Sequence, residues 1–165
     1  MKKFLVILLF VIGCGGGGGG SQSQNTDKIA DWQNREQLCG KIETTCSSSV
    51  TFHDALTKTI QQLPQIKYDP QANEPAWQTS CETITNPIGD CDNFAILYYR
   101  VIMDSCLPEM FDIDVRIRVV SKEKFHHMFV IIYHGLDVFE VDVNAIINVE
   151  SNYNVVYEFD DHTIF

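Results

Sequence analysis

One cysteine, one histidine and one aspartate stand where they could form a nucleophilic catalytic site: Cys91, His127 and Asp142. Asp90 suits the N-cap of a helix, so a helix is expected to begin at Cys91 and to end near Ser105. Its apolar residues recur at the spacing of one helix face: Phe94, Ala95, Tyr98, Val101 and Ile102. A thiol in the first turn lies beside unpaired backbone N–H groups and the positive end of the helix dipole, and both favour the reactive thiolate. The alternative is a buried or disulfide-bonded cysteine.

A predicted β-hairpin brings the histidine and the aspartate together. β-Forming runs cover 126–133 and 136–143, and His134-Gly135 between them suits a two-residue turn. In that register His127 lies directly opposite Asp142, with the two Cβ atoms about 5 Å apart. A carboxylate there would fix the tautomer of the imidazole and support its protonated form. The alternative is a chance cross-strand pair on a solvated face.

The amino terminus has the features of a secretory signal. Residues 1–13 combine two lysines with an apolar run that is too short to span a bilayer as a mature helix. The run ends in Val11-Ile12-Gly13-Cys14, which resembles the lipobox of bacterial lipoproteins, where lipid is attached to the cysteine. Residues 14–26 are rich in Gly, Ser and Gln and indicate a flexible tether, which leaves 27–165 as one domain. The alternative is an ordinary signal peptide or a small membrane anchor.

This terminus predicts a lipoprotein that is anchored to a membrane and faces the periplasm or the cell exterior. Gly15, rather than Asp, after the lipid-bearing residue favours the outer membrane if the source has two membranes. Removal of residues 1–13 leaves 10 basic and 22 acidic side chains, a net charge near −12. Such a charge argues against nucleic acid as a partner and against docking on anionic lipid head groups.

The cysteine count bears on which thiols are paired, because disulfides form outside the cytoplasm. Once the lipid-bearing cysteine is set aside, five remain, so at least one of them is unpaired. Among three pairings we expect Cys39 with Cys46 and Cys81 with Cys106, which leaves Cys91 as the unpaired thiol. Zinc is disfavoured, because the sequence has no closely spaced Cys pair with a His pair of the usual kind.

The remaining patterns predict an α+β fold, with helices that include the Cys91 helix packed on an antiparallel sheet. Helices are expected over 28–38 and over Phe52–Leu63, where His53 is expected to be an exposed residue rather than a ligand. Residues 65–88 are expected to form a long ordered loop, and such loops are usually functional. Strands are expected at 113–119, in both runs of the hairpin and at 155–159.

Three blocks of the chain resemble the bacterial transglutaminase-like cysteine peptidases, the group that includes the periplasmic LapG-type proteases. The blocks are Trp77-Gln78-Thr79-Ser80-Cys81-Glu82-Thr83, Gly89-Asp90-Cys91-Asp92-Asn93-Phe94-Ala95-Ile96 and His127-Met128-Phe129-Val130. The resemblance runs from about 66 to 144 and implies the papain-like, transglutaminase-core fold. It also implies that Cys91 is the nucleophile, His127 the general base and Asp142 the orienting acid. Ser80 stands where family members often have proline, and Val143 where asparagine is common.

The resemblance implies acyl transfer through a thioester. Cys91 would attack a carbonyl, His127 would move the proton, and the Cys91 backbone N–H would be an oxyanion donor. LapG-type enzymes hold calcium with acidic residues beside the nucleophile, here Asp90 and Asp92. Calcium would offset the repulsion between these two carboxylates and a thiolate. The alternative is that Asp90 only caps the helix and Asp92 only occupies its first turn.

The function predicted from the sequence is that of a lipid-anchored cysteine peptidase that cleaves a protein substrate, with a surface adhesin as a candidate. A second interpretation keeps the triad but passes the acyl group to an amine, as transglutaminases do, or processes peptidoglycan peptides. A third is a non-catalytic binding lipoprotein on a degenerate enzyme fold.

Overall fold

The computed structural model describes residues 31–45, 51–70, 77–122, 125–143, 145–148 and 154–159. The predicted signal segment, Cys14 and the tether lie outside these residues, as does Cys46. In the described part of the chain, no helix combines the length and the apolar character that a membrane span requires.

The helices begin close to where the sequence predicts them. Residues 31–38 are helical and are followed by α2 (Phe52–Ile60), α3 (Ser80–Thr85), α4 (Cys91–Asp104) and α5 (Leu107–Phe111). Helix α4 starts at the predicted residue with Asp90 as its N-cap, and its predicted apolar stripe is buried. Helix α2 ends earlier than predicted, before Pro64.

Two short helices were missed by the sequence prediction. Helix α3 interrupts the expected loop over 65–88, and it is held by a capping box in which Thr79 and Glu82 bond each other's backbone amides. Helix α5 forms at Leu107-Pro108, shortly after the end of α4. Proline is tolerated there because the first turn of a helix does not use its N–H groups.

A five-stranded antiparallel sheet follows the helices. Its strands are β3 (Asp114–Lys122), β4 (Phe125–His134), β5 (Asp137–Asp142), β6 (Ala145–Asn148) and β7 (Asn154–Phe159). They lie in the order β6-β5-β4-β3-β7, and β6 is an edge strand that the sequence did not predict. A separate parallel pair consists of β1 (Lys67–Tyr68) and β2 (Ile88–Gly89), and β2 directly precedes α4 in the chain.

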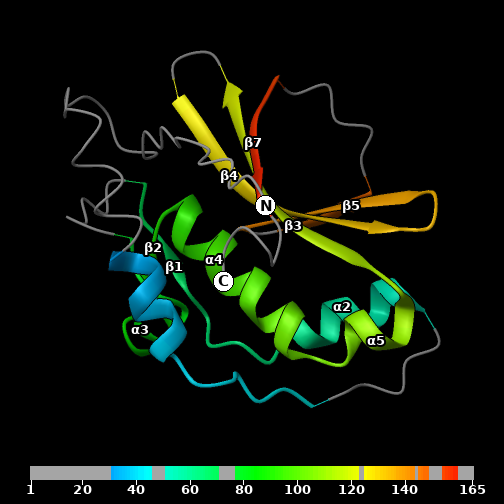
Figure 1. Ribbon diagram of the computed structural model, residues 1–165, viewed down its shortest axis with the longest axis horizontal. Helices are drawn as coiled ribbons and strands as arrows, with labels where there is room; N and C mark the ends of the chain where they lie inside the picture. Colours follow the sequence, from blue (N-terminus) through cyan, green and yellow to red (C-terminus); the bar gives the residue numbers. More distant parts are fainter. Residues whose placement is uncertain are drawn as a thin grey trace, which may run out of the picture.

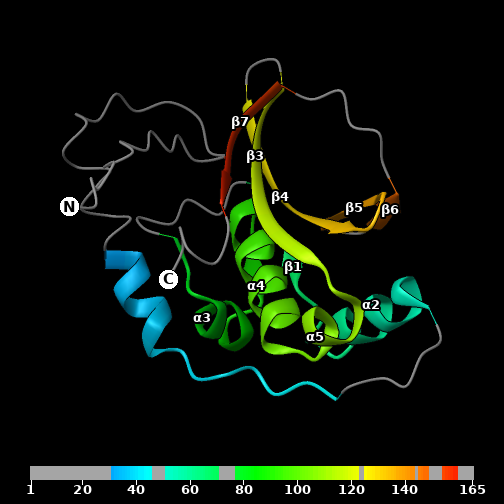
Figure 2. The same cartoon turned by 45° about the vertical axis from the view of Figure 1, so that its right-hand side comes forward.

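Helix α4 is the centre of the core. The sheet curves over it, while α2 and α5 lie together at one end (Figure 1, Figure 2). Alternate residues of β4, Met128, Val130 and Ile132, are buried in the same apolar cluster as Phe94 and Tyr98 of α4. The other face of the sheet carries a smaller buried cluster of Val120, Phe129 and Ile131.

The hairpin between β4 and β5 turns one residue later than predicted. His134 pairs with Asp137, so the turn residues are Gly135 and Leu136 rather than His134 and Gly135. Gly135 has φ of +62°, the left-handed region that glycine adopts most readily and that a type II′ turn requires at its first position. The predicted register is therefore wrong by two residues, and Tyr133 faces Val138.

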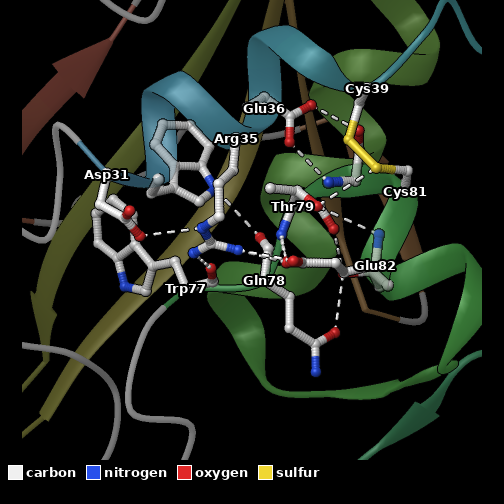
Figure 3. Close-up of polar contacts among 12 residues, drawn as sticks. Asp31, Arg35, Glu36, Cys39, Trp77, Gln78, Thr79, Cys81 and Glu82 are labelled. Carbon is white, nitrogen blue, oxygen red and sulfur yellow. Dashed lines mark hydrogen bonds and ion pairs between the residues drawn. A yellow bond between two sulfur atoms is a disulfide. The ribbon is translucent and has the colours of Figure 1, made fainter.

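The predicted disulfide pairing is also wrong. Cys39, at the end of the first helical segment, is bonded to Cys81 in α3, with Cα atoms 5.7 Å apart. Residues 31–38 pack along α3, which places these two cysteines side by side although 42 positions separate them in the sequence (Figure 3). This contact depends on α3, so the assumption of a structureless loop concealed it.

Candidate active site

Cys91 is the first residue of α4 and is 2% exposed. The backbone before it is fixed, because the Asp90 N–H donates to Asn93 Oδ1 at 2.9 Å. A Cβ atom on Gly89 would lie 2.6 Å from Asn93, so this position has room only for glycine. The backbone N–H of Cys91 lies among the first amides of α4, which have no partner within the helix and could donate to an oxyanion.

The sulfur of Cys91 is in a disulfide with a cysteine outside the described residues. This contradicts the expectation that Cys91 is the unpaired thiol. Cys106, at the other end of α4, is also disulfide-bonded rather than paired with Cys81. The structure therefore has the predicted nucleophile in place at the helix start but in an oxidised state.

His127 and Asp142 form the predicted contact. His127 Nε2 lies 2.7 Å from Asp142 Oδ2, and Asp142 Oδ1 accepts a 2.7 Å hydrogen bond from the backbone N–H of Val143. With Nε2 held by the carboxylate, Nδ1 is the ring nitrogen that remains to exchange a proton. Val143, the family departure noted in the sequence, contributes through its backbone, which any residue but proline could supply.

The contact survives the register error because that error is an even number of residues. A shift of two leaves each side chain on its original face of the sheet, whereas a shift of one would move it to the other face. Asp142 is therefore a diagonal neighbour of His127 rather than its direct partner, and diagonal neighbours are within reach of long side chains.

The strand alternation also sets the position of the imidazole relative to α4. Met128 is buried against α4, so His127 lies on the opposite face of β4, where its ring centroid is 5.8 Å from that of Phe129. The structure thus brings His127 and Asp142 together, whereas the Cys91 sulfur is committed to its disulfide.

Tyr68 links the two parts of the site. Burial raises the pKa of its phenol, and the negative charges of Asp90, Asp142 and Asp92 raise it further. Asp142 and the start of α4 therefore act on the same side chain, although they belong to the sheet and to the helix. Tyr68 is placed there because β1 pairs with β2, which sets it opposite Gly89. The sequence analysis did not identify Tyr68, because a strand of two residues has no periodic pattern.

Three solved structures of one protein are similar to this chain over most of its length. LapG of Legionella pneumophila matches with a TM-score of 0.56 at 18% identity, over 81% of this chain and 84% of LapG. Its calcium-bound form matches with a TM-score of 0.54 at 18% identity, over 88% and 78% of the two chains. Its EGTA-treated form matches with a TM-score of 0.53 at 18% identity, over 80% and 81%. No family model matches the sequence, and no curated protein matches it significantly.

This chain has the papain-like, transglutaminase-core fold. The fold class predicted from the sequence, α+β with the Cys91 helix packed on an antiparallel sheet, is therefore confirmed. Within this fold, the residues of the predicted triad lie at the start of the central helix and on two adjacent strands.

The acidic residues beside Cys91 could contribute to a calcium site. Asp90 and Asp92 are both 7% exposed, and Asp90 Oδ1 is buried without a hydrogen-bond partner in the part of the chain that the structure describes. Carboxylate oxygen is the donor that calcium prefers. Within the described ranges, no group of three or more His, Cys, Asp or Glu side chains could hold a metal, so backbone carbonyls or water would have to complete the coordination.

Gln78 connects the first helical segment to the chain that leads into Cys91. Its Nε2 donates to Ile88 O at 3.4 Å, its Oε1 accepts from Thr83 Oγ1 at 3.1 Å, and its backbone carbonyl accepts from Trp32 Nε1 at 3.2 Å. Figure 3 shows Gln78 at the base of the contact between residues 31–38 and α3. A buried glutamine with partners on three segments positions the strand that precedes α4.

Ser80, the other departure from the family pattern, also has a structural role. Its N–H and its hydroxyl both donate to the buried carboxylate of Glu36, at 2.7 and 2.5 Å. Proline has neither donor and would leave Glu36 without these two hydrogen bonds. Ser80 therefore supplies the two donors that the buried carboxylate of Glu36 needs, and this pair of residues joins residues 31–38 to α3.

Proposed function

We propose that this protein is a lipid-anchored, extracytoplasmic cysteine peptidase that cleaves a protein substrate through Cys91, His127 and Asp142. The observation that carries the proposal is the 2.7 Å contact between His127 and Asp142, in a chain with the fold of LapG and with a cysteine at the start of its central helix. A surface adhesin is the substrate that we favour, and lipid on Cys14 would place the enzyme at a membrane surface.

Lipidation would limit how many of the cysteines can be disulfide-bonded at the same time. A lipid on the Cys14 sulfur would leave five cysteines, and five cysteines cannot all form disulfides with one another. The Cys39–Cys81 bond accounts for two of the five. Catalysis by Cys91 therefore requires reduction of the disulfide that holds its sulfur in this structure.

Each triad residue would have one task. Asp142 orients the imidazole through Nε2 and stabilises its protonated form. Because the His127 ring lies on the face of β4 that points away from α4, the proposal requires it to turn toward Cys91 before Nδ1 can take the proton from the thiol. The thiolate adds to the carbonyl of the scissile bond, and the backbone N–H groups at the start of α4 stabilise the oxyanion. His127 then returns the proton to the leaving amine, and water hydrolyses the thioester.

Calcium is proposed as a structural partner of this site, held in part by Asp90 and Asp92. The comparison with a calcium-bound form of LapG and the partnerless oxygen of Asp90 support it. When bound, the ion would supply positive charge beside Cys91, where two carboxylates otherwise disfavour a thiolate.

The test is the labelling of the mature, lipidated protein with a thiol-directed acyl electrophile. The wild type should show one fast-reacting cysteine, identified by mass spectrometry as Cys91. Labelling should disappear in Cys91→Ala and slow by about 10²- to 10⁴-fold in His127→Ala, the range expected for loss of a general base. Equal, slow labelling of the wild type and His127→Ala would contradict the proposal.

The disulfide at Cys91 favours a second candidate, a non-catalytic binding lipoprotein. In that case the disulfide persists in the mature protein, and peptide mapping without reduction finds Cys91 bonded to another cysteine in all molecules. The enzyme requires a substantial fraction with Cys91 as a thiol, so this mapping separates the two functions before any substrate is known.

A further inference from the structure

We propose that the free edge of β1 holds the substrate backbone in an extended conformation beside Cys91, through the N–H and C=O groups of Tyr68. The inference rests on the proposed peptidase function. It assigns to this edge the acyl side of the substrate, the part that stays attached to Cys91 as the thioester and must be held until water arrives.

The hydrogen bonds of β1 show which of its backbone groups are free. Lys67 N–H donates to Pro87 O at 2.8 Å and Asp69 N–H donates to Gly89 O at 2.9 Å, so these two residues face β2. Successive residues of a strand direct their N–H and C=O groups to opposite edges, so those of Tyr68 point away from β2. Among the residues that the structure describes, β1 pairs with β2 alone, and neither backbone group of Tyr68 has a partner.

This edge lies close to the proposed nucleophile. Tyr68 is opposite Gly89, which precedes Cys91 by two residues in the chain. Neighbouring strands lie about 5 Å apart and rise about 3.3 Å per residue, so a peptide on the far edge of β1 runs about 10 Å from β2. The substrate residue that bonds Tyr68 is therefore within about three residues of the cleaved bond.

The side chain of Tyr68 places the edge beside both parts of the triad. Its ring contacts that of Phe94, one turn after Cys91, with centroids 6.1 Å apart, and the residue is 41% exposed and so open to a ligand. Burial raises the pKa of its phenol, and the charges of Asp142 and of the two aspartates beside Cys91 raise it further. A peptide along β1 would therefore lie near the start of α4 and near Asp142 on the sheet.

Backbone pairing is the form of recognition that this edge offers. An exposed strand edge gains hydrogen bonds when an extended segment is added to it, and such bonds position a peptide without reading its side chains. With two residues in β1 and one facing outward, the edge would bind one substrate residue through two hydrogen bonds. We therefore expect it to fix the position of the substrate and to contribute little to sequence preference.

The first experiment measures backbone recognition with probes of minimal side chain. Cys91 of the mature protein, after reduction, is labelled with acetyl-alanine chloromethyl ketone and with the corresponding tetra-alanine reagent. The tetrapeptide reagent should react faster, by about fivefold for each hydrogen bond gained, and N-methylation of its second or third residue from the ketone should cost about fivefold. A tetrapeptide rate that is insensitive to N-methylation at every position overturns the proposal.

The second experiment removes the donor of the protein. Tyr68→Pro lacks the N–H, and Tyr68→Ala is the matched control, because both variants lose the ring and only alanine keeps the donor. Proline is tolerated on an edge strand where the N–H faces outward, and the bonds to β2 come from Lys67 and Asp69. The ratio of the tetrapeptide rate to the acetyl-alanine rate should be about fivefold lower in Tyr68→Pro than in Tyr68→Ala. Equal ratios overturn the proposal, and the N-methylated probes decide the question on the wild type if Tyr68→Pro does not fold.

The short reagent separates failure of this inference from failure of the peptidase. If acetyl-alanine chloromethyl ketone labels Cys91 at a rate that falls in His127→Ala, but the tetrapeptide reagent gains nothing, the peptidase stands and the edge assignment alone fails. If neither reagent labels Cys91 faster than it labels Cys91 in His127→Ala, the peptidase fails and this inference fails with it.

Discussion

The contact between residues 31–38 and α3 differs from the Cys91 end of α4 in how its polar groups are satisfied. At the first, Arg35 donates to both carboxylate oxygens of Glu82, Glu36 accepts two hydrogen bonds, and a disulfide joins the two segments (Figure 3). At the second, Asp90 Oδ1 is buried without a partner among the described residues.

This difference separates stability from reactivity within one domain. Saturated hydrogen bonds and a covalent link stabilise the folded state, because every buried donor has an acceptor. Buried groups without a partner destabilise the folded state but remain available to a ligand, an ion or a substrate. Substitutions in the first region should therefore change unfolding, and substitutions in the second should change chemistry.

The largest expected effect is on chemistry alone. Asp142→Asn should lower kcat and the rate of Cys91 acylation by roughly 10³-fold, because an amide can no longer stabilise the imidazolium. The free energy of unfolding should change by less than about 1 kcal/mol, since the side chain is partly exposed. Asp114→Asn is the control, an exposed carboxylate on β3 that pairs with Arg116, and its loss should leave acylation unchanged and cost at most about 1 kcal/mol of stability.

The next effect is on stability alone. Replacing Cys39 and Cys81 together by serine should lower the free energy of unfolding by about 4 kcal/mol, the chain-entropy value for a loop closed across 42 positions. Acylation of Cys91, measured well below the new melting temperature, should keep its wild-type rate. A large loss of acylation in the folded double variant would show that the two regions are not independent.

Calcium should raise the free energy of unfolding if Asp90 and Asp92 help to bind it. At 100 times its Kd, calcium should stabilise the protein by about 2.7 kcal/mol and raise its Tm, and EGTA should reverse the shift. Asp92→Asn should weaken this response, because it removes a carboxylate from the proposed ligand set. A Tm that is the same in calcium and in EGTA would argue that Asp90 and Asp92 serve only the helix.

The smallest expected effect is a change with pH in the free energy of unfolding, and it arises at the contact between residues 31–38 and α3. Burial alone would raise the pKa of Glu82, but hydrogen bonds from the Thr79 backbone and from Arg35 outweigh it, and the pKa is lowered. A lowered pKa in the folded state contributes stability above the unfolded value, and this contribution is lost as the pH falls through the folded value. Because Glu82 is half-exposed, we expect only about 0.5 kcal/mol between pH 6 and pH 3, absent in Glu82→Gln and measurable by urea unfolding.

The sequence predicted best what depends on periodicity. The start of α4, its N-cap and its buried face follow from the spacing of apolar residues, and the structure agrees with each. The contact between His127 and Asp142 follows from strand alternation, which is insensitive to an error of two in the register. The turn itself was misplaced because both His134-Gly135 and Gly135-Leu136 contain the glycine that a tight turn needs.

The sequence predicted poorly what depends on tertiary contact. The Cys39–Cys81 bond and the disulfide at Cys91 require knowledge of which segments meet in space, and spacing along the chain does not contain it. Helix α3 is too short for an apolar stripe, although Thr79 and Glu82 have the spacing of a capping box and could have revealed it. A pocket beside Asp142 joins residues from α2, α4, β5 and β6, which no local pattern unites.

The crowding at Gly89 has a consequence for how this protein can vary. Any side chain there would push Asn93 away from the amide of Asp90, which disturbs the backbone immediately before Cys91. Gly40, by contrast, has open space around its missing Cβ. In a library of random variants selected only for survival of function, position 40 should therefore drift through many amino acids, while position 89 should return glycine in every surviving clone.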